Sequence, residues 1–385
     1  MTMNIPEIEF ERLRSLGLTP ALAHRAAAAL ADFAPASGAP VDLQLLRLIE
    51  VHRETVRLHD AEDELSARVM PRLSRRLADD ETGLAVGDWV LAAADAHGQT
   101  WVHARVPPHS HINRRDADGR RQPVVSNVDT ALLVMGLDDD FNPRRLERYL
   151  ALVHATGEYA PGSTAGDAAG VRPVVVLTKA DVAARTPGLI AARIEALRGR
   201  VPARIDLVAI DGTDAYTVQQ LLPYLGAGQT LVVLGSSGAG KSTLTNTLLG
   251  APVQDTGTVR ESDSRGKHTT TSRSLHRLPT GACVIDTPGL RALRPDADEA
   301  SLAASFGDIE ALAGRCRFRD CKHHDEPGCA VREGVAADRL SNYHKLLREV
   351  RRDTMGVVER QRQLTVWKTR DRASRERCRI KRNEA

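Results

Sequence analysis

The sequence has few aromatic residues, few cysteines and no long apolar run. These scarcities exclude an aromatic-rich core, a disulfide framework and a membrane-spanning helix. Aromatic side chains make up 3% of the 385 residues, so the core must be built largely from alanine, valine and leucine. Apolar runs span only a few residues, as in 174–177, whereas a membrane-spanning helix needs about 20. Five cysteines in a chain of this length are no disulfide framework. The first residues lack the basic-then-apolar pattern of a secretory signal, so we expect a cytoplasmic protein with no membrane partner.

The formal net charge is only +3, but positive charge is concentrated at one end of the chain. Residues 348–385 hold thirteen Arg or Lys against six Asp or Glu, a surplus of +7, so the remainder carries −4. A basic tail on a near-neutral body is typical of an arm that contacts nucleic acid or another anionic surface. A solvated, charged helix would give the same composition.

Local patterning divides the chain into several parts, as its length also suggests at roughly 150 residues per domain. Short apolar runs with turn signals predict a small β-barrel near the N-terminus, either an OB-fold or an SH3-like barrel. Strand-like runs then alternate with helix-like segments, which indicates a mostly parallel sheet covered by helices. The predicted parts are a helical N-terminal extension (1–44), the barrel (45–125), the α/β domain (126–295), a mostly helical domain around a cysteine cluster (296–350) and a basic C-terminal helix or tail (351–385).

The strongest motif is a glycine-rich loop, GSSGAGKS, which matches the phosphate-binding pattern G-x-x-x-x-G-K-S in full. A strand-like run precedes it and a helix-like segment follows, so backbone N–H groups and a helix N-terminus would face an anion. Lys241 would reach the β- and γ-phosphates, Ser242 would bind Mg²⁺, and Thr243 would lie near the α-phosphate. The predicted nucleotide-binding residues of this loop are Gly235, Ser236, Ser237, Gly238, Ala239, Gly240, Lys241, Ser242 and Thr243.

A second motif, Asp286-Thr287-Pro288-Gly289, directly follows a strand-like run. An Asp at a strand end can steady Mg²⁺ through water, and Gly289 can supply an N–H for the γ-phosphate and a hinge for a switch loop. The segment GKHTTT lies between the two motifs. One of its threonines, Thr269, Thr270 or Thr271, could be a second Mg²⁺ ligand that becomes ordered with GTP, or all three could be strand surface.

A third motif, Thr178-Lys179-Ala180-Asp181, follows the buried-type run VVVL. The Asp181 carboxylate could accept hydrogen bonds from guanine N1–H and the exocyclic amine, whereas adenine would leave the carboxylate unpaired. The stem of Lys179 can lie over the base. Small GTPases carry the guanine-binding motif last, but here Asp181 precedes Lys241. A sheet can be cut and rejoined with its site intact when its termini lie close, so this order predicts a circular permutation.

Three cysteines and a histidine form a cluster, C-x(4)-C-x-H-x(5)-C. Three thiolates and one imidazole form a closed tetrahedral set suited to one structural Zn²⁺. The predicted ligands are Cys316, Cys321, His323 and Cys329, with His324 as a rival ligand and buried reduced cysteines as the simpler alternative. Zn²⁺ would fold a short segment that has little core of its own, and the arginines around it could face RNA phosphates.

These motifs, their order, the run Ser126-Asn127-Val128-Asp129 and the cysteine cluster together resemble the ribosome small subunit-dependent GTPases. This is the RsgA (YjeQ) family of circularly permuted GTPases, and the resemblance covers roughly residues 45–350. It implies an OB-fold, a permuted P-loop GTPase domain and a C-terminal zinc domain that uses His323. It also implies a monomer that binds GTP or GDP, the small ribosomal subunit and its rRNA.

Two positions depart from common GTPase patterns. The guanine motif of the family begins with Asn, which ties neighbouring loops together, and the shorter Thr178 could lower nucleotide affinity. Leu290 stands where many small GTPases carry a Gln that orients the attacking water, so intrinsic hydrolysis should be slow and need help. The resemblance suggests His268 as the helper, although His268 could equally be a surface residue.

The leading hypothesis is therefore a GTPase that acts in late maturation or checking of the small ribosomal subunit. The subunit would stimulate hydrolysis of GTP to GDP and phosphate, and the protein would then dissociate. One alternative is a nucleotide-gated RNA-binding module with little or no turnover. Another is an ATPase or kinase with the same phosphate loop, against which Asp181 argues.

Overall fold

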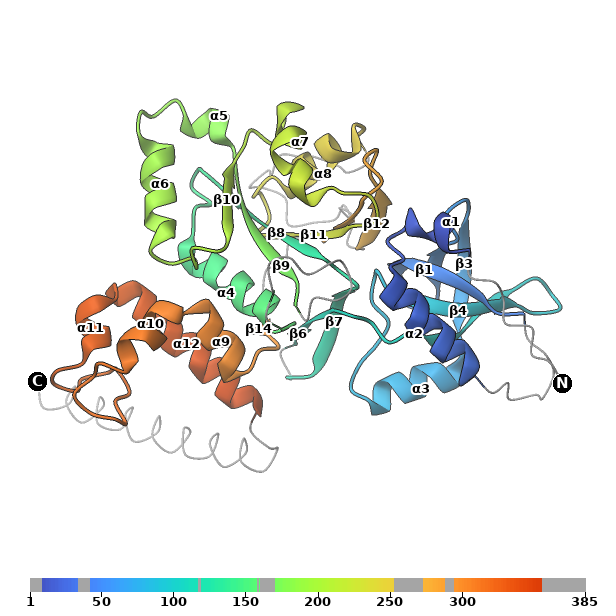
Figure 1. Ribbon diagram of the computed structural model, residues 1–385, viewed down its shortest axis with the longest axis horizontal. Coiled ribbons are helices and arrows are strands. Elements are labelled where there is room, and N and C mark those ends of the chain that lie inside the picture. The colour runs from blue at the N-terminus through green and yellow to red at the C-terminus, as the bar shows by residue number, and fades with distance from the viewer. Residues whose placement is uncertain are drawn as a thin grey trace, which may run out of the picture.

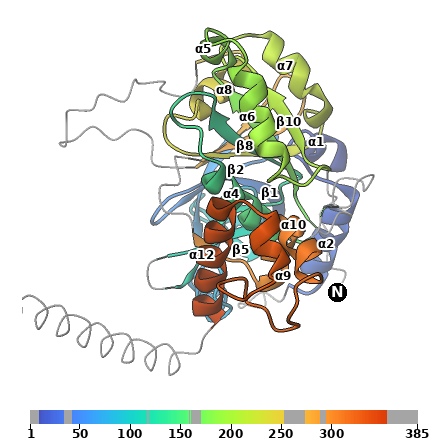
Figure 2. The ribbon, with the colours of Figure 1, turned by 90° about the vertical axis from the view of Figure 1, so that its left-hand side faces the viewer.

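The computed structural model describes most of the chain as three connected bodies (Figures 1 and 2). The N-terminal barrel and the C-terminal helices lie at opposite ends of the long axis in Figure 1, with an α/β body between them. None of the described helices is long and apolar enough to cross a membrane. The described residues are 9–33, 42–116, 119–157, 159, 170–252, 273–287 and 294–354.

The first body is a closed five-stranded barrel, which confirms the barrel expected from the sequence. Its strands pair in the order β1-β2-β3-β5-β4, and β4 returns to β1 to close it. Three helices accompany it, of which α1 and α2 precede the barrel and α3 lies between β3 and β4. The elements are β1 (Gln44–Val51), β2 (Val56–His59), β3 (Glu64–Val69), β4 (Trp89–Ala94), β5 (Thr100–Arg105), α1 (Phe10–Arg14), α2 (Pro20–Ala31) and α3 (Pro71–Asp79).

The two N-terminal helices pack against the outside of the barrel through a shared apolar cluster. Thr19 caps α2 by accepting a hydrogen bond from the N–H of Leu22 at 3.3 Å. At the edge of the cluster lies Arg47 of β1, which is fully buried and has its guanidinium 5.1 Å from the centre of the Trp89 ring. It donates to the carbonyls of Leu16 at 3.0 Å and Asn127 at 3.2 Å. One buried cation thus joins the N-terminal extension, the barrel and the start of the α/β body.

The central body is a mostly parallel sheet with the spatial order β10-β9-β8-β11-β13-β12. The helices α4 and α6 cover one face, whereas α7 and α8 cover the other, so residues on both faces of the strands are buried. From β8, the next two strands along the chain, β9 and β10, are added on one side, and β11 is then added on the other side of β8. The elements are β8 (Thr130–Gly136), β9 (Arg172–Thr178), β10 (Asp206–Ala209), β11 (Thr230–Gly235), β12 (Ser274–Arg277), β13 (Cys283–Asp286), α4 (Pro143–His154), α5 (Ala180–Ala183), α6 (Leu189–Arg198), α7 (Tyr216–Leu221), a short 3₁₀ helix (Leu222–Tyr224) and α8 (Lys241–Leu249).

Residues far apart in the sequence connect the bodies. The barrel and the sheet are continuous because β12 pairs with β1 at Glu50 and Ser274. A separate three-stranded sheet joins the hairpin of β6 (His111–Arg115) and β7 (Arg121–Ser126) to β14 (Arg294–Pro295). Directly after β14, the Asp296 carboxylate pairs with Arg115 and Arg121 of the hairpin, each at 2.7 Å.

The C-terminal body consists of α9 (Glu299–Ser305), α10 (Gly307–Ala313), α11 (Ala330–Gly334) and α12 (Ala337–Thr354) around its own small apolar core. It docks on α4 through the carboxylate of Glu147, which is only 1% exposed. Arg339 and Asn342 of α12 donate to this carboxylate at 2.7 and 2.5 Å, and Arg200 donates at 3.1 Å. A buried charge with three donors fixes the position of α12 on the sheet domain.

A buried histidine in the same contact predicts a pH dependence of stability. His154 of α4 lies 2.8 Å from the Ser305 hydroxyl, and burial lowers its pKa from 6.5 to about 4. Because the unfolded chain takes up this proton first as the pH falls, stability should decrease between about pH 6.5 and 4. The contribution is about 2 kcal/mol from pH 7 to 5.

This prediction is tested by denaturant unfolding at both pH values. His154→Gln should reduce the loss of stability on acidification by that amount, whereas His24→Gln, on the exposed side of α2, should leave it unchanged. Equal pH dependence in the wild type and His154→Gln would contradict the assignment.

Candidate nucleotide site and metal cluster

The glycine-rich loop lies at the carboxyl ends of β8 and β11. At this point the strand order reverses, because β9 and β10 lie on one side of β8, whereas β11 and β13 lie on the other. This is the position at which open parallel sheets bind ligands. A Cβ at Gly235 would lie 2.4 Å from the Val134 carbonyl oxygen, so only glycine fits. Gly240 has a φ of +87° and precedes the first residue of α8, Lys241. The Lys241 ammonium is buried and donates to the Ser236 carbonyl at 2.7 Å, which places a cation inside the curl of the loop.

The carboxylate of Asp286 ends β13 on the neighbouring strand, opposite Val233. Asp286 is 7% exposed, and within the described part of the chain its Oδ1 atom has no hydrogen-bond partner. Burial raises the pKa of Asp286, and the charge of Lys241 opposes that shift. An unpartnered carboxylate oxygen beside the phosphate loop and Ser242 suits a hydrated divalent cation, so these residues fit the Mg²⁺ expected with a nucleotide.

Two further acidic residues that the sequence analysis missed come from the loop after β8. The Ser236 hydroxyl hydrogen-bonds to Asp140, 2.8 and 2.7 Å from its two carboxylate oxygens. Asp138 pairs with the ammonium of Lys179 at 2.6 Å, and Lys179 lowers the pKa of Asp138. The sequence signal was an acidic run, GLDDD, directly after a buried strand.

The guanine-type motif contacts the phosphate loop directly. The Thr178 hydroxyl donates to the Ala239 carbonyl at 2.6 Å, and Gly240 approaches Thr178 closely. Thr178 therefore forms a tie between the loops, although it is shorter than Asn. Lys179 adopts a left-handed backbone with a φ of +60°, and Asp181 is exposed on the short helix that follows.

A loop after β10, residues 210–213, also lies beside both motifs, and the sequence analysis did not single it out. The Ile210 carbonyl accepts a hydrogen bond from the Ala180 N–H at 3.1 Å. The Gly212 carbonyl accepts one from the Thr247 hydroxyl of α8 at 2.6 Å. The loop thus connects the third motif to the helix of the phosphate loop. Its sequence, IDGT, is an ordinary turn sequence that gave no signal.

Several predicted site residues lie outside the described residues. They are His268, Thr269, Thr270, Thr271, Pro288, Gly289 and Leu290, together with the linker at 34–40 and the tail beyond 354. Ser237 and Gly238 are exposed at the tip of the loop, and Ser242 and Thr243 are half-buried at the start of α8. The described motif residues thus meet at one edge of the sheet.

The tie at Thr178 gives a direct prediction. Thr178→Val keeps the shape of the side chain but removes the hydroxyl, which leaves the buried Ala239 carbonyl without this donor. The loss should be about 1–2 kcal/mol, or about 5- to 30-fold weaker binding of GDP in a fluorescence titration. Thr186→Val, an exposed threonine beyond α5, is the matched control and should bind normally. Normal binding by Thr178→Val would show that the tie does not support the site.

The predicted metal ligands converge in the loop between α10 and α11. One ligand atom from each of Cys316, Cys321, His323 and Cys329 lies within 4.8 Å of the others. The Sγ atoms of Cys316 and Cys329 are 3.9 Å apart, and His323 Nδ1 is 3.6 and 3.5 Å from them. Tetrahedral Zn²⁺ with its usual bond lengths requires about 3.8 Å between sulfurs and about 3.6 Å from sulfur to nitrogen. The cluster could therefore hold a metal ion.

His324 is not part of this set. Its ring stacks on His344 of α12, with the ring centres 4.1 Å apart. The structure therefore groups His323 with the three cysteines, as the resemblance implies.

The fold and the site define a circularly permuted P-loop GTPase. The phosphate loop lies where the strand order reverses, and the guanine-type motif precedes this loop in the sequence. The model of the family described as RsgA GTPase matches residues 106–295. Small ribosomal subunit biogenesis GTPase RsgA from Xanthomonas oryzae pv. oryzae (strain MAFF 311018) is 44% identical over 312 residues, which are 79% of this chain and 80% of that protein. The protein of the same name from Xanthomonas campestris pv. campestris (strain B100) is 45% identical over equal shares. The chain belongs to the RsgA GTPase family and is a GTP hydrolase.

Solved structures show the same fold. YjeQ from Thermotoga maritima aligns with a TM-score of 0.55 at 21% identity, over 80% of this chain and 98% of that one. YloQ, described as a circularly permuted GTPase, aligns with a TM-score of 0.51 at 22% identity, over 82% of this chain and 97% of that one.

Proposed function

We propose that this protein hydrolyses GTP during late maturation or checking of the small ribosomal subunit. The observation that carries the proposal is the 44% identity, over most of both chains, to a protein named for small ribosomal subunit biogenesis. The contact of Thr178 with the phosphate loop supports the guanine part of it, because a base held at Asp181 would join phosphates held at Lys241. GTP would favour the conformation that binds the subunit, and hydrolysis would favour release.

In the proposed mechanism, the loop N–H groups and Lys241 hold the phosphates and stabilise the charge that develops on them. Mg²⁺, held by Ser242, one of the threonines at 269–271 and a water on Asp286, would neutralise phosphate charge. Gly289 would contact the γ-phosphate, and His268 would orient the attacking water. Lys179 would cover the base and Asp181 would accept its hydrogen bonds.

The other proposals concern the whole chain. The chain would be divided into domains after residues 44, 125, 295 and 350, as predicted from the sequence. The cluster at Cys316 would hold one structural Zn²⁺. The protein would act as a cytoplasmic monomer, and the barrel, the C-terminal body and the basic tail would contact rRNA through phosphates and shape.

The first experiment is GTP turnover with and without purified small ribosomal subunits, at low and moderate salt. Large subunits and ATP are the controls. Strong stimulation by small subunits alone, weakened by salt, would support the proposal. Absence of stimulation with normal GTP binding would favour the alternative, a nucleotide-gated RNA-binding module.

A second experiment tests the base specificity. Asp181→Asn removes the acceptor pair for guanine, so preference for GDP over ADP in competition should fall by at least about tenfold. Asp63→Asn, on the exposed turn between β2 and β3 of the barrel, is the matched control. Unchanged guanine preference in Asp181→Asn would refute the assignment of Asp181.

A further inference from the structure

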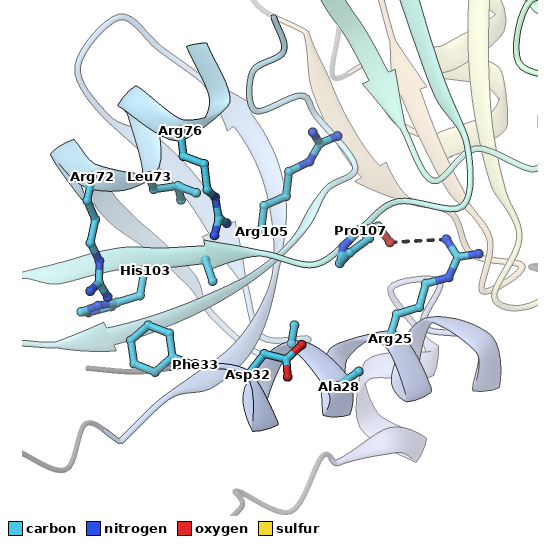
Figure 3. A pocket seen from close by; sticks show the side chains of 12 residues that line it. Arg25, Ala28, Asp32, Phe33, Arg72, Leu73, Arg76, His103, Arg105 and Pro107 are labelled. Carbon is cyan, nitrogen blue, oxygen red and sulfur yellow. Dashed lines mark hydrogen bonds between the residues drawn. The ribbon is translucent and has the colours of Figure 1, made fainter. Parts of the chain in front are cut away.

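A pocket of about 500 Å³ lies on the barrel and has no residue of the nucleotide motifs in its lining (Figure 3). Helix α2 forms one side, and α3 and β5 form the other. The size is within the range of about 300–1,000 Å³ that is usual for small-ligand sites. Its lining includes Arg25, Ala28, Phe33, Arg72, Leu73, Arg76 and His103.

Part of the wall is aromatic and apolar. The rings of Phe33 and His103 meet edge to face with their centres 5.7 Å apart. Burial and the nearby charge of Arg72 lower the pKa of His103, so its ring is neutral at pH 7. Ala28 of α2 and Leu73 of α3 complete this apolar part of the lining (Figure 3). Such a wall can accept the flat face of a base.

The rest of the wall is mainly basic, with the carboxylate of Asp32 as its one acidic group among the lining residues (Figure 3). The guanidinium of Arg72 lies 5.2 Å from the centre of the Phe33 ring, and Arg76 extends from the next turn of α3 (Figure 3). Arg25 donates to the Pro108 carbonyl at 2.7 Å. Within the described residues, these three arginines have no acidic side chain within 4 Å. Cations without acidic partners beside an aromatic wall suit a ligand that carries both a phosphate and a base.

We propose that this pocket receives one unpaired nucleotide of an RNA strand, with its phosphate beside Arg72 and Arg76 and its base against Phe33 and His103. An inorganic anion would use only the arginines and leave the aromatic wall empty. The choice of RNA as the source of the nucleotide rests on the proposed function, because an rRNA partner supplies unpaired nucleotides. The pocket itself does not depend on the GTP site.

The main test fills the pocket without changing any charge. Ala28 is exposed and lines the pocket, so Ala28→Trp should block it, whereas Ala27→Trp places the same side chain on α2 outside the lining. The full-length protein is titrated into a fluorescently labelled single-stranded oligoribonucleotide, and binding is followed by anisotropy. Ala28→Trp should weaken binding by about tenfold or more, and Ala27→Trp by less than about twofold. Equal affinities for the two variants, or no binding by the wild type at low salt, would overturn the proposal.

The two parts of the nucleotide are tested separately. Arg76→Ala should weaken binding and reduce the salt slope by about 0.7 for the lost phosphate contact, more than Arg75→Ala, which removes the same charge from α3 outside the pocket. Phe33→Leu keeps an apolar side chain but removes stacking, so it should weaken binding about fivefold or more with an unchanged salt slope. Equal effects of Arg75→Ala and Arg76→Ala, or normal binding by Phe33→Leu, would show diffuse attraction of RNA instead of a nucleotide pocket.

Competition separates an RNA strand from a free nucleotide. AMP should displace the oligoribonucleotide only at far higher concentration, and inorganic phosphate should do so no better than chloride at equal ionic strength. Displacement by AMP as effective as by unlabelled RNA would overturn the RNA source. Subunit-stimulated GTP turnover of the wild type, measured in parallel, shows separately whether the proposed function holds.

Discussion

Replacement of Lys241 by methionine is expected to lower GTP hydrolysis by about two to three orders of magnitude. Methionine keeps the unbranched stem in α8 but removes the cation that lies inside the phosphate loop, 2.7 Å from the Ser236 carbonyl. The charge on the transferred phosphate would lose its nearest side-chain cation. The buried carboxylate of Asp286 would also lose the charge that opposes its raised pKa. The measurement is phosphate release with and without small ribosomal subunits.

Two comparisons make this result specific. Lys345→Met removes one positive charge from the exposed surface of α12, and hydrolysis without subunits should remain unchanged. Both variants should still unfold cooperatively, because neither lysine belongs to the apolar clusters on the two faces of the sheet. Normal hydrolysis by Lys241→Met would mean that the glycine-rich loop does not hold the reacting phosphates.

The sequence predicted those strands that are apolar runs of strand length directly followed by a motif. The runs that became β9, β11 and β13 are apolar over strand length, and each is followed by a motif at its carboxyl end. In a parallel sheet such ends lie together, so the approximate location of the nucleotide site followed from strand boundaries alone. The spacing of the metal ligands was a similar local signal, since a short loop can bring together ligands only a few residues apart.

The sequence could not predict contacts that depend on reach and register. The bond from Thr178 to Ala239 requires two loops to approach within one hydroxyl length, which the motif does not encode. Likewise, the pairing of β14 with β6 joins segments on either side of the whole sheet domain. Arg47 of β1 is a further case: it is fully buried, and carbonyls from two other segments accept hydrogen bonds from its two Nη atoms. Such partners become visible only when the chain is folded.

If the cluster holds Zn²⁺ as proposed, removal of the metal is expected to unfold the loop between α10 and α11 and to loosen the C-terminal body. The small core of this body includes Cys329, and Cys316 and Cys321 pack against it, so the ligands are also part of the packing. Structural Zn²⁺ contributes about 10–16 kcal/mol in small domains, far more than this core can replace. Cys321→Ser should therefore lose stoichiometric metal and become sensitive to protease between 314 and 330. The α/β sheet should persist, because its own core lies on both faces of separate strands.

Matched variants separate the metal cluster from a general effect of losing a thiol or an imidazole. Cys283→Ala removes a buried thiol of β13, outside the cluster, and should retain one metal ion per chain. His323→Gln should lose the metal, whereas His324→Gln should lose only the contact with His344 and keep it. Metal content by mass spectrometry and hydrogen exchange of residues 314–330 are the measurements. If His324→Gln lost the metal and His323→Gln kept it, the fourth metal ligand would be His324 and not His323. If the wild type bound no metal, the cluster would be three reduced cysteines packed beside a histidine, and the C-terminal body would fold through its apolar core alone.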